Sequence, residues 1–221
     1  MLLLFDIDGT LLLKASAEHA AAVREALREV YGVVPEGEAV ARIEKAGRTD
    51  LEIARNICLL SGVTAERFDA GRDDFRAACV AAYARLCPPD LSAHVAPGVT
   101  EVLEALSERD AVRLAILTGN LEPVARLKLA RASLGHFFEP WVGGFGSDHE
   151  DRTELPAIAR ARAGGYPRAQ TVIIGDTPRD IACARADGLR CIAVATGPFS
   201  ASELADADVV LDSAHDLLDV L

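Results

Sequence analysis

The sequence predicts an α/β protein with a doubly wound parallel sheet and an all-helical segment inserted after the first strand. Short apolar runs alternate with helical patterns along most of the chain, whereas residues 15–92 show helical spacing and no strand-like run. The length of 221 residues also agrees, since it lies between one domain and two at roughly 150 residues per domain. Without residues 15–92, the remainder has the size of one ordinary α/β domain.

Five short apolar runs are the expected strands of the sheet. Each is followed by a polar turn and a helical pattern, and this alternation is typical of a parallel sheet. Pro123 and Pro178 stand near helix starts and Gly188 stands just past a helix end, where these residue types are favoured. The five expected strands are residues 2–5, 112–117, 171–174, 191–194 and 208–211.

The inserted segment is predicted to be a helical cap. Ala, Leu, Val and Ile recur at helical spacing in three stretches, which are residues 15–30, 51–60 and 75–86. Thr49 followed by Glu52 is a capping box that starts the second of these helices. The predicted domains are therefore a catalytic core of residues 1–14 and 93–221 and a cap of residues 15–92.

Composition excludes several classes of protein. Acidic side chains outnumber basic ones 34 to 23, and the net charge of −11 argues against binding to nucleic acid or to an anionic membrane. The five cysteines form no C-x-x-C pair and are expected to be reduced core residues. The apolar N-terminus is too short to span a bilayer and lacks a basic region. We expect a cytoplasmic protein, and the sequence predicts no particular oligomeric state.

The strongest motif places two carboxylates at the end of the first strand. Asp6 and Asp8 are two residues apart, so in an extended segment both side chains project to the same side. They would enter the crevice at the carboxyl ends of the strands, where ligands bind in open α/β folds. Gly9 would let the chain turn while its backbone stays close to a ligand.

Further polar residues follow later strands and are expected at the same edge. Thr118, Gly119 and Asn120 offer a hydroxyl and backbone N–H groups near a helix start, which suits a phosphate. Asp176 adds a third carboxylate, and Asp180 follows in the same turn. Because three acids in one crevice repel each other unless a cation is present, an oxygen-rich Mg²⁺ site is predicted.

These residues, taken in order, resemble the motifs of the haloacid dehalogenase superfamily, and specifically its phosphatase branch with a helical cap. Asp6 to Thr10 resembles the first motif, Thr118 the second, and Asp176 with Asp180 the fourth. The third motif is usually a Lys before a helix, but no Lys occupies that region. Arg152 is the candidate for that position, and the alternative is that Arg152 forms a surface ion pair with a neighbouring acid.

The resemblance implies hydrolysis of a small phosphate ester through an aspartyl-phosphate. Asp6 would be the nucleophile and Asp8 the general acid and base. Asp6, the Asp8 carbonyl and Asp176 would bind Mg²⁺, and Asp180 would orient Arg152 or a metal-bound water. The remaining expected site residues contact the substrate: Thr118 and Arg152 as catalytic groups, and Gly9, Thr10, Gly119, Asn120 and Arg48 as binding groups.

Several alternatives stay open at this point. Arg48 in the cap either binds a carboxylate or second phosphate of the substrate or is a solvated residue beside a helix cap. The leading hypothesis is a phosphatase similar to phosphoglycolate phosphatases. The others are a phosphosugar isomerase similar to β-phosphoglucomutase, a phosphonatase-like hydrolase with Lys45 as the cap lysine, and a signalling receiver domain. The second acid, Asp8, favours phosphate esters over haloacids.

Overall fold

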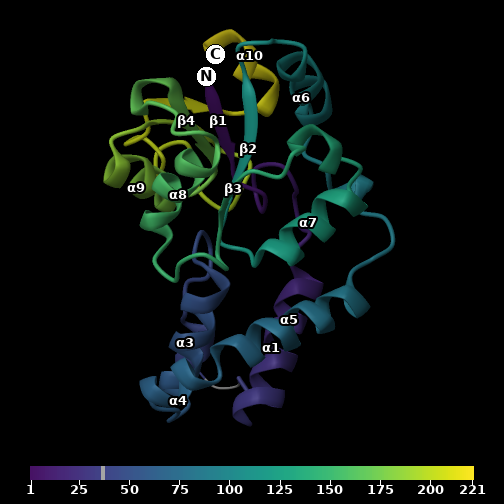
Figure 1. The fold of residues 1–221 in the computed structure, drawn as a ribbon, viewed down its shortest axis with the longest axis vertical. Coiled ribbons are helices and arrows are strands. Elements are labelled where there is room, and N and C mark those ends of the chain that lie inside the picture. Colours follow the sequence, from purple (N-terminus) through teal and green to yellow (C-terminus); the bar gives the residue numbers. More distant parts are fainter. Residues whose placement is uncertain (36–37) are drawn as a thin grey trace.

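The computed structural model describes residues 1–35 and 38–221, and its centre is a six-stranded parallel sheet. The strand order is β3-β2-β1-β4-β5-β6, so the N-terminal strand is central (Figure 1). Five strands match the predicted runs, while β3 was not predicted. The strands are β1 (Leu2–Phe5), β2 (Arg113–Thr118), β3 (Gly143–Phe145), β4 (Thr171–Gly175), β5 (Arg190–Val194) and β6 (Val209–Leu211).

Helices cover both faces of the sheet, as a doubly wound fold requires. Because side chains alternate across a strand, Leu3 and Phe5 of β1 pack on one side, and Leu2 and Leu4 pack on the other. The first side faces α6 (Val99–Ser107), α7 (Glu122–Arg131) and α10 (Leu217–Val220). The second side faces α8 (Leu155–Arg162) and α9 (Pro178–Asp187).

The segment after β1 is helical, as expected, and lies beyond the carboxyl ends of the strands (Figure 1). It contains two more helices than the sequence predicted, the short α2 and α4. Its helices are α1 (Ala17–Tyr31), α2 (Glu38–Ala41), α3 (Asp50–Leu60), α4 (Ala65–Ala70) and α5 (Arg72–Leu86). The domain limits at residues 14–15 and 92–93 stay a prediction, and residues 36–37 of the predicted cap lie outside the described residues.

The predicted capping box at α3 forms only in part. The Thr49 hydroxyl accepts a hydrogen bond from the Glu52 N–H at 3.1 Å, but the Glu52 carboxylate pairs with Arg48. Short 3-10 turns complete the chain: η1 (Ser92–His94), η2 (Gly135–Phe138), η3 (Arg152–Glu154), η4 (Arg168–Gln170) and η5 (Ala214–Asp216). Within residues 1–35 and 38–221, no helix combines the length and apolar character needed to cross a membrane. All five cysteines are buried free thiols.

Candidate active site

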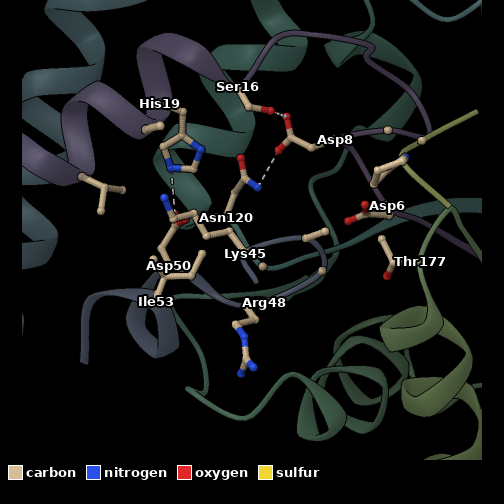
Figure 2. Close-up of a pocket in the computed structure, with 18 of the residues that line it drawn as sticks. Asp6, Asp8, Ser16, His19, Lys45, Arg48, Asp50, Ile53, Asn120 and Thr177 are labelled. Carbon is tan, nitrogen blue, oxygen red and sulfur yellow. Dashed lines mark hydrogen bonds and ion pairs between the residues drawn. The ribbon is translucent and has the colours of Figure 1, made fainter. Parts of the chain in front are cut away.

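A cavity of about 550 Å³ lies between the carboxyl ends of the strands and the helical segment (Figure 2). Helices α1 and α3 form one side of it, and the loops that follow β1, β2 and β4 form the other. Most of the predicted site residues line this cavity: Asp6, Asp8, Gly9, Arg48, Gly119, Asn120, Arg152 and Asp176. Thr10, Thr118 and Asp180 are buried and are not among the residues that line the cavity.

Three carboxylates meet where β1 and β4 end. The side chains of Asp6, Asp176 and Asp180 each offer an oxygen, and these oxygens lie within 4.8 Å of one another. One guanidinium stands among them: Arg152 Nη2 donates to Asp6 Oδ1 at 2.9 Å and to Asp180 Oδ1 at 2.5 Å. Arg152 is buried, so it is not in a surface ion pair. We call these four residues the acid cluster.

The acid cluster carries more negative charge than its own cation can balance. Burial is the main reason that the pKa of Asp6 is raised to about 7, with repulsion from Asp180 and Asp8 opposing the attraction of Arg152. Burial also raises the pKa of Asp176 to about 8, and repulsion from Asp6 and Asp180 adds to it. When all three carboxylates are ionised, the single guanidinium leaves two negative charges unbalanced. The cluster therefore favours a divalent cation.

The surroundings of Asp176 fit a hard metal ion. Its Oδ1 accepts a hydrogen bond from the Thr10 hydroxyl at 3.1 Å, whereas its buried Oδ2 has no hydrogen-bond partner among the described residues. Gly9 adopts a positive φ of 99°, and a Cβ built there would lie only 2.1 Å from that Oδ2. A buried carboxylate oxygen without a partner is costly, and a bound cation would supply the missing partner of Asp176 Oδ2. Because the ligands on offer are all oxygens, the site fits Mg²⁺.

Asp180 links the acid cluster to the start of α9. Thr177 and Asp180 form a complete capping box at the start of α9, and the Asp180 Oδ2 also accepts from the Thr177 hydroxyl at 2.7 Å. The other oxygen of Asp180 accepts from Arg152, so both oxygens are occupied. This arrangement fixes the Arg152 guanidinium, which also donates to the Gly47 carbonyl at 3.1 Å.

Asp8 stands in a different environment, which the sequence analysis did not predict. Lys128 of α7 is completely buried, and its Nζ donates to both carboxylate oxygens of Asp8, at 2.8 and 2.6 Å. Asn120 Nδ2 and the Ser16 hydroxyl donate to the same carboxylate at 2.9 and 3.1 Å. Figure 2 shows the Asp8 side chain directed toward Ser16 and Asn120. Burial opposes ionisation, but the Lys128 charge prevails and the pKa of Asp8 is lowered.

Lys128 is linked onward to the helical segment. Its Nζ lies 3.2 Å from His19 Nδ1, and His19 Nε2 lies 3.0 Å from Asp50 Oδ2. Asp50 Oδ2 also accepts from the Leu121 N–H at 2.8 Å. We call Asp8, Lys128, His19 and Asp50 the boundary chain, because its members come from the first loop, α7, α1 and α3.

The loop before α3 docks directly on the residues after β2. The Asp50 N–H donates to the Gly119 carbonyl at 2.8 Å, and the Thr49 hydroxyl donates to the Glu150 carbonyl at 2.6 Å. A Cβ at Gly119 would lie 2.1 Å from the Arg48 carbonyl oxygen, so only glycine fits there. The contact at Gly119 thus holds the loop before α3 at the edge of the cavity.

Three residues that were predicted to contact the substrate form hydrogen bonds or ion pairs within the protein. The Thr118 hydroxyl accepts from Asn120 Nδ2 at 3.1 Å, and Thr10 bonds to Asp176. The Arg48 guanidinium pairs with Glu52 and donates to the Glu44 carbonyl at 2.7 Å. It points away from Asp6 and Asp8 (Figure 2). The substrate contacts of Thr10, Thr118 and Arg48 stay predictions.

Comparison with known proteins identifies the family of the chain. Residues 1–188 match the family model of haloacid dehalogenase-like hydrolases, which covers β1, the helical segment and the loop after β4. The chain belongs to this family. The matched residues of the hydrolase include the acid cluster and Asp8.

Relatives of the hydrolase align along almost its whole length. Phosphoglycolate phosphatase 1 of Pseudomonas aeruginosa is 26% identical over 221 residues, covering 98% of the hydrolase and 78% of the relative. The probable phosphatase IndB of Dickeya dadantii is 28% identical, covering 98% and 91%. A solved hydrolase from Pseudomonas syringae is 22% identical with a TM-score of 0.70, covering 99% and 96%, which supports the fold.

Proposed function

We propose that this hydrolase is a Mg²⁺-dependent phosphatase that hydrolyses a small phosphorylated metabolite through an aspartyl-phosphate on Asp6. The chain is a phosphoric monoester hydrolase by its family and relatives, and the metal and the intermediate are the proposed part. The observation that carries the proposal is the acid cluster, whose two excess negative charges and orphaned Asp176 oxygen call for a divalent cation.

Asp6 is suited to act as the nucleophile. Arg152 holds its Oδ1, while its other oxygen has no hydrogen-bond partner in the described part of the chain, and Asp6 lines the cavity. A bound Mg²⁺, held by Asp6, Asp176 and the Asp8 carbonyl, would offset the repulsion between this carboxylate and an anionic phosphate. In the first step the free oxygen of Asp6 bonds to phosphorus, and the bond between phosphorus and the alcohol oxygen breaks.

Asp8 is suited to move the protons of both steps. The Asp8 carboxylate, ionised beside Lys128 in the structure, would take up a proton as the phosphate ester binds and give that proton to the departing alcohol oxygen. The restored carboxylate then takes a proton from water as the water oxygen attacks phosphorus. The second attack releases phosphate and regenerates Asp6. Thr118, the Gly119 N–H and Arg152 are the proposed partners of the transferring oxygens, with Arg152 taking the electrostatic role that a Lys usually has.

The cavity supports an organic alcohol with an apolar portion. Its wall on the side of the helical segment includes Val23, Ile53 and Ile57, whereas the polar His19 and Asp50 in the same wall are hydrogen-bonded to each other. The same wall also carries the basic side chains of Arg24 and Lys45. 2-Phosphoglycolate, suggested by the relatives, is the reference substrate, and phosphate esters of larger, partly apolar alcohols fit the volume of about 550 Å³.

A panel of phosphorylated metabolites with phosphate detection tests the proposal. We expect Mg²⁺-dependent release of phosphate from at least one member, and loss of that release in Asp6→Asn, which cannot form the phosphoenzyme. The panel includes a hexose 1-phosphate with product analysis. Conversion to the 6-phosphate without free phosphate, or turnover retained in Asp6→Asn, would refute the proposed phosphatase.

A further inference from the structure

The boundary chain has one consistent pattern of hydrogens. The Lys128 ammonium has three N–H donors and accepts nothing, so His19 Nδ1, which lies 3.2 Å from it, must be the acceptor. The hydrogen of a neutral His19 then sits on Nε2 and is donated to Asp50 Oδ2 at 3.0 Å. The donors therefore run in one direction from Lys128 through His19 to Asp50, while the other two Lys128 hydrogens point at Asp8.

This pattern gives Asp8 a fixed orientation. Lys128 contacts both of its oxygens, and Asn120 and Ser16 each hold one of them, so the carboxylate cannot rotate without losing several charge-assisted bonds. Lys128 also supplies the positive charge that Asp8 needs. Asp8 is therefore not drawn toward the cation site of the acid cluster, and its side chain stays directed at the cavity.

The boundary chain also depends on contact between the helical segment and α7. His19 of α1 and Asp50 of α3 belong to the helical segment, whereas Lys128 belongs to α7. Asp50 is held at the boundary by the Leu121 N–H at 2.8 Å, and its own N–H reaches the Gly119 carbonyl at 2.8 Å. Separation of the helical segment from α7 would break the link between His19 and Lys128.

We propose that Lys128 is a positioning residue that holds Asp8 against the leaving oxygen of the substrate, and that His19 and Asp50 keep Lys128 in place when the helical segment is docked. This inference rests on the proposed function, since it assigns Lys128 a part in the proton transfer of Asp8. The bond from phosphorus to the alcohol oxygen breaks, the Asp8 proton goes to that oxygen, and the Lys128 ammonium faces the carboxylate that remains. Lys128 itself neither bonds to the substrate nor changes its charge.

The test compares two leaving groups. An alkyl ester such as 2-phosphoglycolate needs a proton on its departing oxygen, whereas p-nitrophenolate departs without one. In Lys128→Met we expect the rate of alcohol release in a single turnover to fall about 100-fold for the alkyl ester, the lower range of general-acid effects. The burst of p-nitrophenol should change by less than about threefold. An equal loss for both esters would mean a merely structural role and would overturn the proposal.

Matched variants separate position from charge and from folding. Lys45→Met removes a lysine that lines the same cavity but has no contact with Asp8, so it should not discriminate between the two esters. Adding Lys128→Met to Asp8→Asn removes both members of the buried pair, and it should cost no further activity if Lys128 acts only through Asp8. A further loss in the double variant would contradict the proposal.

His19→Phe tests the part of the boundary chain that lies in the helical segment. The phenyl ring keeps the edge-to-face packing of His19 on Tyr83, with ring centroids 5.4 Å apart, but removes both ring nitrogens. We expect a loss of about tenfold that again affects the alkyl ester more than the nitrophenyl ester. An equal loss for the two esters would show that His19 and Asp50 do not act through Lys128. A wild-type protein without Mg²⁺-dependent turnover of any ester in the metabolite panel would instead refute the proposed function.

Discussion

Asp6 and Asp8 are two residues apart in the chain, yet they stand in opposite electrostatic environments. Asp6 belongs to the acid cluster, where Asp176 and Asp180 outweigh the single cation Arg152 and the pKa of Asp6 is raised to about 7. Asp8 belongs to the boundary chain, where Lys128 contacts both of its oxygens and its pKa is lowered.

The difference shows how one short motif can serve two roles. The acid cluster is short of positive charge and would be completed by a metal ion, so its carboxylates are suited to bind one. The boundary chain already contains its cation, so Asp8 has no need of the metal through its side chain and remains available for proton transfer. Changes to the two regions should therefore have effects of different kind.

The largest effect is expected from removing the cation of the acid cluster. Arg152→Met leaves Asp6 and Asp180 buried without their partner, which should cost about 3–5 kcal/mol of stability and lower kcat by about 100-fold or more. Arg152→Lys keeps the charge but cannot reach Asp6, Asp180 and the Gly47 carbonyl together, so an intermediate loss is expected. Urea unfolding and steady-state kinetics measure both. Wild-type stability in Arg152→Met would contradict the account.

Metal affinity should distinguish the two regions directly. Asp176→Asn removes a proposed ligand and should weaken Mg²⁺ binding by about 100-fold or more, or about 2.7 kcal/mol. The matched control is Asp50→Asn, which alters a buried carboxylate of the boundary chain and should leave Mg²⁺ affinity within about threefold. Calorimetric titration with Mg²⁺ gives both constants. Equal weakening in the two variants would show that the regions are not independent.

Stability of the metal-free protein should fall as the pH rises from about 5 to 8. The folded-state pKa values of Asp6 and Asp176 are about 7 and about 8, above the ordinary 3.8, so the folded state binds more protons than the unfolded state in this range. The expected slope is at most about 1.4 kcal/mol per pH unit for each group.

Urea unfolding at several pH values in the presence of a chelator measures this slope. Mg²⁺ should stabilise the protein increasingly as the pH rises, because the ion replaces the protons, and Asp176→Asn should reduce the slope by removing one of the two groups. A metal-free stability that increases steadily across this range would be inconsistent with the raised pKa values.

The smallest effect is expected at the loop that docks on Gly119. Thr49→Ala removes the cap of α3 and the bond to the Glu150 carbonyl, and it should cost about 1 kcal/mol and raise KM by a few fold. Thr64→Ala is the control, because Thr64 caps α4 in the same way, accepting from the Arg67 N–H at 3.3 Å. It should cost a similar stability without changing KM. A KM unchanged in Thr49→Ala would show that this contact does not contribute to docking.

Much of the fold could be predicted from the sequence because its strands are apolar and its helices periodic. The exception among strands was β3, whose Gly143 and Gly144 give no apolar or β-branched signal in a run of three residues. It forms because glycine allows close approach: a Cβ at Gly143 would lie 2.3 Å from the Ile116 carbonyl oxygen of the neighbouring strand. Such a contact depends on the tertiary structure.

The acidic half of the site could be predicted, but Lys128 could not. Asp6, Asp8 and Asp176 follow directly after strands, so the topology alone brings them together. Lys128 lies on a helix far along the chain from Asp8. A signal was present, since helical spacing places Lys128 on the same face as the buried Val124 and Ala125. That pattern indicates that the Lys128 ammonium is buried, but it does not indicate that Asp8 is its partner.

The central place of β1 has a consequence for the order in which the protein folds. Leu2 pairs with Arg113 on one side and with Thr171 on the other, so β1 is synthesised long before the strands that pair with it. Helices α1 and α5 lie within one stretch of sequence and can pack against each other much earlier. Contacts that are distant in sequence slow folding. We therefore expect the helical segment to collapse first during synthesis, and the sheet that carries the nucleophile to be completed last.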